Sequence, residues 1–423
     1  MIHHNHAAVS RRRFLQGAAA CTWAVPQLVP GAALGKGAVA PSERIVLGGI
    51  GMGWRGQNVL RYMFENPEPQ FVAVADARRI RREAIKRVAD EHHGNSDCAM
   101  YHDFREVLER PDIDAVLIAT GDRWHALTSI LAAKAGKDIF CEKPCFMTIA
   151  ECRAVAETVR RYGVVYQAGT QRRTIGNYVL AIQLVIDGVL GELREVHANI
   201  GNPALTYDWL PAEPEPSADE VDWEMWLGPC PWRPYNSRYV TGGWRGHFDF
   251  HGGGILEWGA HTVDLCQWAA GKEHTGPVEF EPIGTEVHAR YADGIKLVMR
   301  DTGWLGRGTC SIRFVGSDGW LESGDSATMQ IHPESLRAHL GIFTSPGIWP
   351  VNHVRDFFDC VKTRALPASN VDVTCQSHIA CHAAYIAWQL GRPLRWDPEA
   401  EEFPGDDEAN HMRSRAYREP WRI

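Results

Sequence analysis

The sequence of 423 residues lacks three features that would each point to a class of protein. It contains no uninterrupted run of about 18 or more apolar residues, which argues against a membrane-spanning helix. It contains no lysine- and arginine-rich block, and its formal net charge is -8, so nucleic acid is not an expected partner. Its 11 cysteines form no C-x-x-C motif, so we expect neither a disulfide framework nor a cysteine-bound metal.

The features that are present are those of an ordinary globular chain. Apolar residues make up 45% of the sequence and charged residues 23%, and the length suffices for two domains.

The N-terminus resembles a twin-arginine export signal. Residues 10–16 read S-R-R-R-F-L-Q, with Gln16 where lysine is usual, and an alanine-rich stretch follows to Gly35. The alternative is a disordered basic arm. We therefore leave residues 1–40 out of the fold and expect a periplasmic or otherwise extracytoplasmic protein that is exported already folded.

A glycine-rich turn follows the first strand-like run. Gly51, Gly53 and Gly56 form G-x-G-x-x-G at the start of a helical pattern that includes Trp54 and Arg55. In a dinucleotide fold the first glycine allows a tight turn, the second admits the diphosphate and the third lets helix and strand pack closely. We therefore expect the cofactor phosphates at the start of this helix.

A carboxylate stands where a dinucleotide ribose would need one. The run QFVAVAD ends at Asp76, 20 residues after Gly56, and this spacing favours NAD. Arg78 and Arg79 follow directly and keep NADP open, because arginine can hold a 2′-phosphate.

Strand and helix patterns alternate from 42 to 168, which predicts an α/β domain with a doubly wound parallel sheet. Expected strands lie at 114–120, 138–144 and 164–169, and expected helices at 82–92, 125–136 and 149–163. Ligands of such sheets bind beyond the carboxyl ends of the strands. This rule places Thr120, His125, Glu142 and Lys143 beside the cofactor.

These residues carry a family resemblance. Thr120, His125, the run Ala135-Gly136-Lys137 and the run Glu142-Lys143-Pro144 resemble the Gfo/Idh/MocA oxidoreductases, with Gly121 replacing the usual proline. The resemblance implies a Rossmann domain followed by an α+β domain with a large, mostly antiparallel open sheet. We assign residues 169–390 to that second domain and 391–423 to a tail that packs back on the body. It also implies a homo-oligomer.

The stretch HGGGILEWGAHTVDLCQW, residues 251–268, contains three ionisable residues at helical spacing: Glu257, His261 and Asp264. They form either a polar stripe on a surface helix or a reactive cluster in a pocket. The resemblance favours the cluster, with Lys143 and His261 as the groups that handle a substrate proton. It also assigns site positions to Asp264 and to Glu257, where relatives usually carry aspartate.

Aromatic and polar residues near this stretch are candidates for sugar binding. We predict that Trp124, Tyr235, Trp244, Arg245 and His247 contact substrate, although each aromatic ring can equally be plain core. His247 and a histidine four residues later have metal-ligand spacing, but nothing nearby completes a set, so we predict no metal.

The combined prediction is a carbohydrate-active enzyme with tightly bound NAD, or NADP, that transfers hydride at a sugar carbinol carbon. An exported enzyme has no soluble NAD pool, so the cofactor must be regenerated within each cycle. Two sugars can exchange hydride, or a redox-neutral glycosidase can oxidise C3 transiently and eliminate the leaving group. The remaining alternative is a non-catalytic sugar-binding protein with a vestigial nucleotide site.

Overall fold

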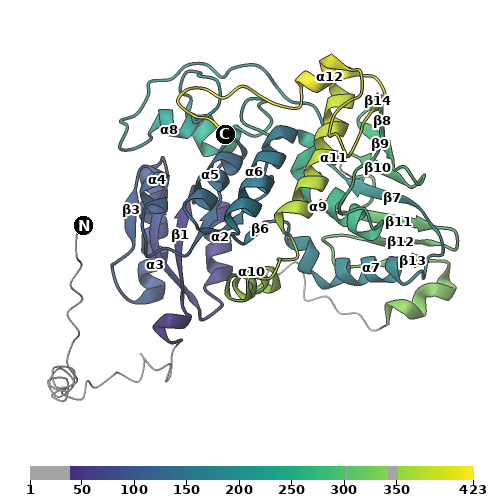
Figure 1. Cartoon of the computed structure of the whole chain (residues 1–423), viewed down its shortest axis with the longest axis horizontal. Coiled ribbons are helices and arrows are strands. Elements are labelled where there is room, and N and C mark those ends of the chain that lie inside the picture. The colour runs from purple at the N-terminus through teal and green to yellow at the C-terminus, as the bar shows by residue number, and fades with distance from the viewer. Residues whose placement is uncertain (1–38, 302, 342–350) are drawn as a thin grey trace, which may run out of the picture. The chain divides into compact units, whose positions relative to one another are not determined.

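A computed structural model describes residues 39–301, 303–341 and 351–423. The chain divides into two units, Met1–Arg44 and Ile45–Ile423. The described part of the first unit contains one 3-10 turn, η2 (Pro41–Glu43). The predicted export signal lies outside the described residues. The second unit contains two sheets (Figure 1).

The first sheet is parallel and six-stranded, in the order β3-β2-β1-β4-β5-β6. Its strands are β1 (Ile45–Ile50), β2 (Pro69–Ala75), β3 (Ala99–Tyr101), β4 (Ala115–Ile118), β5 (Asp138–Cys141) and β6 (Tyr166–Ala168). All residues of β4 and β5 are buried, as expected for central strands covered on both faces. The helices of this half are α2 (Trp54–Met63), α3 (Arg79–His93), α4 (Phe104–Leu108), α5 (Asp122–Lys134) and α6 (Ile149–Tyr162).

Most element boundaries differ from the sequence prediction by one to three residues, and two of these differences bear on the site. The expected strand 138–144 ends at Cys141, and the expected helix 125–136 begins at Asp122. Both differences occur where the chain leaves the carboxyl edge of the sheet, because side-chain and pocket contacts there replace the strand ladder. They place Glu142 and Lys143 beyond their strand and His125 in the first turn of α5.

The second sheet has eight strands in the order β13-β12-β11-β7-β10-β9-β8-β14. Its strands are β7 (Leu193–Asn199), β8 (Glu279–Ile283), β9 (Glu286–Arg290), β10 (Lys296–Arg300), β11 (Ile312–Gly316), β12 (Trp320–Ser323), β13 (Gln330–His332) and β14 (Leu394–Arg395). Neighbours are antiparallel except for β7 and β10, which run parallel. The predicted fold class, a Rossmann domain joined to a mostly antiparallel sheet domain, is confirmed.

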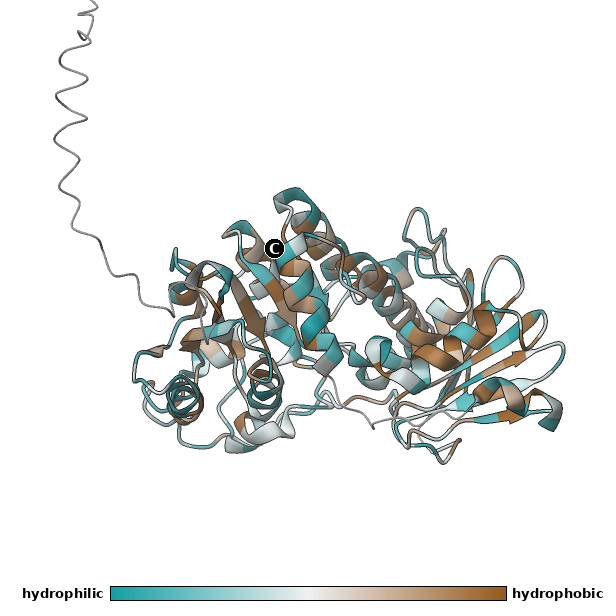
Figure 2. Ribbon diagram, turned by 90° about the horizontal axis from the view of Figure 1, so that it is seen from below, coloured by the Kyte–Doolittle hydropathy of each residue, from teal (hydrophilic) through white to brown (hydrophobic). Residues whose placement is uncertain are grey.

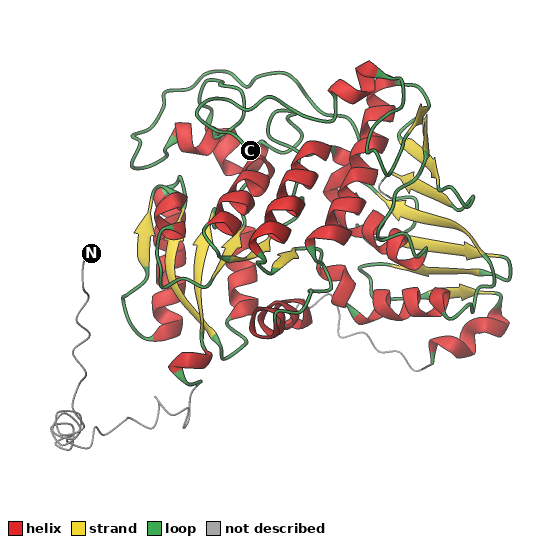
Figure 3. Cartoon of the chain, viewed as in Figure 1, coloured by secondary structure: helices red, strands yellow, loops and turns green. Residues whose placement is uncertain are grey.

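Two long helices lie between the sheets (Figure 3). α9 (Gly254–Ala269) packs against β7, β10 and β11, and α11 (Val371–Leu390) packs against α9, β8 and α6. Hydrophobic residues, brown in Figure 2, occupy these helices and the parallel strands, whereas strands of the large sheet alternate between brown and teal. α9 is therefore a core helix and not a surface helix with a polar stripe.

Shorter elements complete the described chain. They are η3 (Gln171–Thr174), α7 (Gly176–Ile186), α8 (Trp223–Leu227), η4 (Tyr239–Gly243), η5 (Glu334–Leu340), α10 (Val351–Thr363) and α12 (Asp407–His411).

Candidate active site

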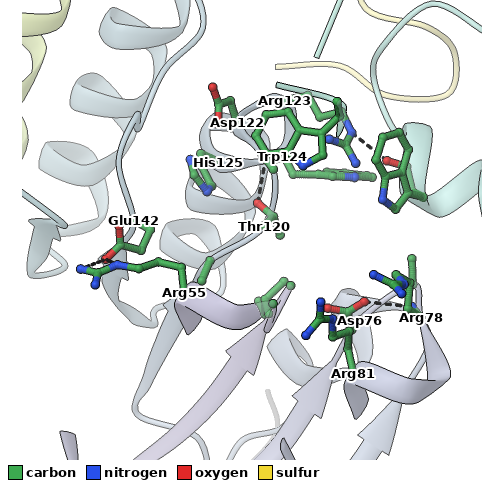
Figure 4. A pocket seen from close by; sticks show the side chains of 18 of the residues that line it. Arg55, Asp76, Arg78, Arg81, Thr120, Asp122, Arg123, Trp124, His125 and Glu142 are labelled. Atoms are coloured by element: carbon green, nitrogen blue, oxygen red, sulfur yellow. Dashed lines mark hydrogen bonds and ion pairs between the residues drawn. The ribbon is translucent and has the colours of Figure 1, made fainter. Parts of the chain in front are cut away.

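The carboxyl edge of the parallel sheet opens into a pocket that collects most of the predicted site residues (Figure 4). Residues between Met225 and Arg245 form its opposite wall. The predicted residues that line it are Gly51, Gly53, Trp54, Arg55, Asp76, Thr120, Trp124, His125, Glu142, Lys143, Trp244 and Arg245.

The three glycines take the positions that a dinucleotide requires. Gly51 has a φ of 68°, and a side chain there would overlap Thr120. A Cβ on Gly53 would meet only open space, and no side chain caps α2 at this residue, so its first N–H groups are available to an anion. A Cβ on Gly56 would lie 3.0 Å from Ala119, which explains the close packing of helix on strand.

Asp76 lies at one end of the pocket, beside Arg78 and Arg81 (Figure 4). Its Oδ1 accepts the Arg78 N–H at 2.9 Å, and burial raises the pKa of Asp76 despite the opposing Arg78 contact. Arg79 points elsewhere, because it pairs with Asp219 at 2.5 Å. Of the two arginines that kept NADP open, only Arg78 lines the pocket.

Four buried polar atoms of this pocket have no hydrogen-bond partner in the described chain: Arg78 Nε, Arg123 Nη1, His125 Nε2 and Thr128 Oγ1. The Arg123 guanidinium lies 3.7 Å from the Trp226 ring centroid and donates through Nε to the Trp226 carbonyl at 2.7 Å, but its Nη1 has no acceptor. Burial lowers the pKa of Arg123 to about 10. His125 contacts the Pro144 carbonyl through Nδ1 at 2.5 Å, and its Nε2 has no partner. Phosphate, hydroxyl and amide groups of a dinucleotide match such groups, so the residues fit the cofactor.

Glu142 holds the Arg55 side chain in place at the edge of the pocket. Its Oε1 accepts from Arg55 Nε at 2.9 Å and from Gln171 Nε2 at 2.8 Å. The carboxylate therefore fixes the Arg55 side chain at the start of α2, on the opposite side of the pocket from Asp76 (Figure 4).

Lys143 joins the cofactor pocket to α9. Its Nζ donates to the Glu257 carbonyl at 2.8 Å and to Glu257 Oε1 at 3.1 Å, and it lies 4.7 Å from the Trp258 ring centroid. An ammonium has three N–H donors, so these bonds leave one for a ligand within the described chain. The Lys143–Pro144 peptide bond is cis.

Glu257 bridges Lys143 and a histidine that precedes the glycine run. While Oε1 accepts from Lys143, Oε2 lies 3.1 Å from His251 Nε2. Burial by itself would raise the pKa of Glu257, but Lys143 and His251 outweigh it and hold the pKa of this carboxyl well below its ordinary value. The carboxylate is ionised, and 24% of its side chain stays exposed.

His261 lies one turn deeper on α9 and does not line the cofactor pocket. Its Nε2 is 3.2 Å from Arg172 Nη1, and its buried Nδ1 has no partner in the described chain. Burial, followed by the charges of Arg172 and Lys143, lowers the pKa of His261 well below its ordinary value. The ring is therefore neutral, and its Nε2 is in contact with the Arg172 guanidinium.

Asp264 is held inside a buried ion pair. Arg173 donates to Oδ2 at 2.6 Å through Nε and to Oδ1 at 2.8 Å through Nη2. Burial raises the pKa of Asp264 even against the charge of Arg173. Both oxygens of this predicted site residue are bonded to Arg173, and the residue does not line the pocket.

The predicted substrate residues divide into two groups. Trp124, Trp244 and Arg245 line the pocket, and the Arg245 guanidinium lies 4.6 Å from the Trp244 ring centroid. Tyr235 and His247 do not line it and pack in a neighbouring aromatic cluster.

A polypeptide segment covers the dinucleotide pocket; we call residues 219–245 the covering segment. Its backbone carbonyls accept Arg78 Nη1 at Val240 (2.6 Å) and Trp124 Nε1 at Met225 (2.9 Å). The C-terminal tail contacts the covering segment, since the Arg418 backbone N–H donates to the Pro229 carbonyl at 2.8 Å. Trp421 of the same tail packs edge-on against Trp124, with ring centroids 4.7 Å apart.

Two features are absent from the described residues. No group of three or more His, Cys, Asp or Glu residues is arranged to hold a metal ion. No helix in residues 39–301, 303–341 and 351–423 is long and apolar enough to cross a membrane.

Sequence reasoning missed several residues of this region. Arg172 and Arg173 follow β6, so the strand-end rule that selected Lys143 would have found them. Arg123 stands between the chosen positions Thr120 and His125, and the sequence offers no reason to prefer it. His251 was considered only for metal spacing, and no local pattern reveals its contact with Glu257.

The parallel sheet, the glycine turn and the ammonium at the sheet edge together define an NAD-binding oxidoreductase. Family models agree over both halves of the chain. Residues 45–170 match the NAD-binding Rossmann fold of the oxidoreductase family, and residues 184–423 match its C-terminal alpha/beta domain. The chain belongs to the Gfo/Idh/MocA oxidoreductase family.

Individual relatives are more distant. The chain is 30% identical over 149 residues to the 2,7-anhydro-N-acetylneuraminate hydratase of Mediterraneibacter gnavus, which covers 35% of this chain and 37% of that protein. It is 27% identical over 293 residues to the rhizopine catabolism protein MocA of Rhizobium meliloti, covering 66% and 78%. The hydratase alignment thus spans well under half of that relative.

A solved structure has the same fold. The aldose-aldose oxidoreductase of Caulobacter crescentus, in complex with glycerol, superposes with a TM-score of 0.61. The match covers 83% of this chain and 99% of that one at 18% sequence identity.

Proposed function

We propose that this protein is an NAD-dependent oxidoreductase that moves hydride at a carbinol carbon of a sugar or glycoside. The observation that supports the proposal is the position of Lys143. Its ammonium lines the dinucleotide pocket and retains one free N–H donor. A group of this kind stabilises the negative charge that develops on a hydroxyl oxygen during oxidation.

Each residue of the site has a distinct task in this proposal. Bound NAD supplies a hydride acceptor at its nicotinamide. The α2 N-terminus with Arg55 would hold the phosphates, and Asp76 would accept hydrogen bonds from the ribose hydroxyls. Lys143 would orient the substrate hydroxyl and lower its pKa. His261 is the proton acceptor that the family resemblance implies, acting as a neutral ring beside Arg172.

A carbohydrate is the substrate class that we favour. Trp124 and Trp244 present ring surfaces to the pocket, and apolar C–H faces of sugars stack on such rings. Arg245 adds donors for hydroxyl groups. The printed names of the aldose-aldose oxidoreductase and of the anhydroneuraminate hydratase also point to sugars.

We further propose that the cofactor is retained during turnover and that the enzyme works outside the cytoplasm, after export through its N-terminal signal. The covering segment supports retention, since Arg78 and Trp124 bind its backbone and Arg418 of the C-terminal tail donates its N–H to the Pro229 carbonyl of the segment. A homo-oligomer remains a proposal that rests on the family resemblance alone.

A redox-neutral glycosidase is the second candidate. In that cycle oxidation at C3 acidifies the C2 proton, elimination expels the leaving group, and the hydride returns. The similarity to a hydratase that acts on an anhydro sugar favours this candidate. The complete glycine turn, Asp76 and Lys143 argue against the third reading, a vestigial nucleotide site.

Product analysis distinguishes these candidates. Purified full-length protein is incubated, without added NAD, with p-nitrophenyl glycosides and separately with pairs of free aldoses. Release of p-nitrophenol far beyond the enzyme concentration would indicate the glycosidase, and a lactone together with an alditol would indicate sugar–sugar hydride exchange. Acid denaturation of the same protein should release NAD or NADP, and a preparation that is fully folded but releases neither refutes retention.

A further inference from the structure

A second cavity lies beneath the C-terminal tail; we call it the tail cavity. Its volume is about 370 Å³, within the range of about 300–1,000 Å³ that is typical of small-molecule sites. Residues of α5, α6, the covering segment, α11 and the tail line it, among them Arg123, Glu151, Cys230, Tyr385, Met412 and Arg415. We propose that the tail cavity binds a small organic monocarboxylate with an apolar body, whose carboxylate is held by the Arg415 and Arg123 guanidiniums.

Arg415 of the tail offers the edge of a guanidinium that binds carboxylates. The residue is half-buried, and its guanidinium lies 3.9 Å from the Phe248 ring centroid. Nη1 donates to the carbonyls of Phe248 at 2.6 Å and of His251 at 3.2 Å, whereas Nε and Nη2 have no acceptor in the described chain. Arg173 uses this same Nε and Nη2 edge to bind both oxygens of Asp264. The free edge of Arg415 therefore matches a carboxylate in a bidentate pair.

Arg123 is the second cation of the cavity wall. Only 4% of the residue is exposed, and it is the one described residue that lines both the tail cavity and the dinucleotide pocket. Its Nε donates to the Trp226 carbonyl at 2.7 Å, and its Nη1 has no acceptor. Neither Arg123 nor Arg415 forms an ion pair within residues 39–301, 303–341 and 351–423. A buried charge is costly without a counter-ion, so both guanidiniums favour an anionic ligand.

The two guanidiniums converge on one part of the cavity, around Cys230. This thiol is buried and donates to the Asp249 carbonyl at 2.7 Å. Burial raises the pKa of Cys230 to about 12, although the charges of Arg123 and Arg415 oppose the shift. Both cations therefore lie near the same sulfur atom. Because the thiol stays neutral, it does not supply the counter-ion.

The other ionisable groups that are buried or half-buried in the wall leave positive charge in excess. Glu151 accepts the Tyr417 hydroxyl at 2.7 Å and a backbone N–H at 2.5 Å, and burial raises its pKa. Asp249 is already paired with Arg233. Burial lowers the pKa of His382 to about 3, so this ring is neutral. Two guanidiniums thus face one carboxylate without a cation of its own, and a single negative charge restores the balance.

The rest of the wall selects the body of the ligand. Met147, Pro229, Phe248, Tyr385 and Ile386 present mostly apolar surface. A phosphate or sulfate would leave several of its oxygens against this surface without a donor. A carboxylate needs donors for two oxygens only, and its aliphatic or aromatic body gains free energy from burial against the same side chains.

The first test measures binding without turnover, so it does not depend on the proposed function. Full-length protein with saturating NAD is titrated by calorimetry with phenylacetate and, separately, with phenylacetamide, its neutral counterpart of the same shape. We expect phenylacetate to bind with a Kd of about 1 mM or lower. The amide should bind about tenfold more weakly or worse, because it lacks the charge that pairs with the guanidiniums. Absence of phenylacetate binding, or equal binding of the two compounds, overturns the proposal.

The second test locates the bound compound. Arg415→Met removes the bidentate edge, and Met412→Trp places a large ring at the cavity wall, so each should weaken phenylacetate binding by about tenfold or more. Arg413→Met is the matched control for the first variant, since Arg413 also belongs to the tail and donates to the Glu401 carbonyl but does not line the cavity. Met329→Trp is the control for the second, because Met329 is half-buried and lies outside the cavity.

Arg415→Met also loses two hydrogen bonds to backbone carbonyls, so its unfolding temperature and its NAD content are measured beside those of wild type. If this variant does not fold, Met412→Trp decides the location by itself, because it leaves those bonds in place. Weaker binding in the cavity variants, with wild-type binding in both controls, supports the tail cavity. Wild-type affinity in folded Arg415→Met and Met412→Trp would show that phenylacetate binds elsewhere and that the proposal is wrong.

Discussion

The two carboxylates of α9 differ far more than their chemistry suggests. Glu257 and Asp264 are seven residues apart on one helix, and each contacts a cation. Glu257 contacts Lys143 at the pocket and stays partly exposed, and the pKa of this carboxyl is held below its ordinary value. Asp264 is closed into a bidentate pair with Arg173, and burial raises its pKa. The cationic partner and the access of solvent, rather than the residue type, decide which acid is available for chemistry.

Of the substitutions around Glu257, removal of the Lys143 ammonium should lower kcat the most. We expect Lys143→Ala to lower kcat by about 100- to 10,000-fold, because the developing alkoxide loses its stabilising charge. Turnover of the p-nitrophenyl glycoside or aldose probe measures this, and the NAD content controls for cofactor loss. Unchanged turnover would mean that the active site lies elsewhere.

Removal of Asp264 should affect stability and not chemistry. Asp264→Ala removes both carboxylate contacts from Nε and Nη2 of the buried Arg173 and leaves it only Glu273 as an acidic partner, so we expect the free energy of unfolding to fall by up to about 3–5 kcal/mol. Urea unfolding gives this value. Asp293→Ala is the control, because Asp293 pairs with Lys272 at the surface and should cost less than about 1 kcal/mol. Equal losses in the two variants would contradict the comparison.

Shortening Glu257 by one methylene tests its bridging role. Glu257→Asp should lower kcat by about tenfold, because the shorter side chain cannot reach both Lys143 and His251. Glu286→Asp provides a matched control, since Glu286 also joins a histidine and a cation, His288 and Arg300, away from α9. Full activity of Glu257→Asp would remove the reason for glutamate at this position.

The buried histidines should make the free energy of unfolding depend on pH. Burial lowers the pKa of His353 to about 4 and those of His378 and His382 to about 3. Each ring is neutral in the folded chain and gains a proton on unfolding below its ordinary pKa of about 6.5. Stability is therefore complete above about pH 6.5 and falls toward pH 4, by up to about 1.4 kcal/mol per pH unit for each histidine.

Urea unfolding at several pH values measures this slope. In His382→Gln the dependence of the free energy of unfolding on pH should weaken by the contribution of one histidine, up to about 1.4 kcal/mol per pH unit. A free energy of unfolding that stays constant between about pH 6.5 and pH 4.5 would show that these rings are not buried as neutral groups.

The comparison also shows where reasoning from the sequence ends. The parallel sheet, the glycine turn and the strand-end positions of Lys143 and Asp76 were predictable, because they follow from short-range patterns that physics repeats in every such fold. The large sheet was predicted from the family resemblance. The sequence could not distinguish Glu257 from Asp264 as site residues. Helical spacing places both near one face of the helix, but it does not show which residues of other elements contact that face.

The sequence by itself determined the fold class, the NAD-binding turn and the helix that contains Glu257, His261 and Asp264. Local geometry suffices for these features, since each depends on residues close together in the chain. Only the tertiary structure decided that Arg173 hydrogen-bonds both oxygens of Asp264, that Arg172 contacts the His261 ring, and that the His251 ring contacts the Glu257 carboxylate. Each of these contacts joins separate elements, and burial then sets which charge remains free to act.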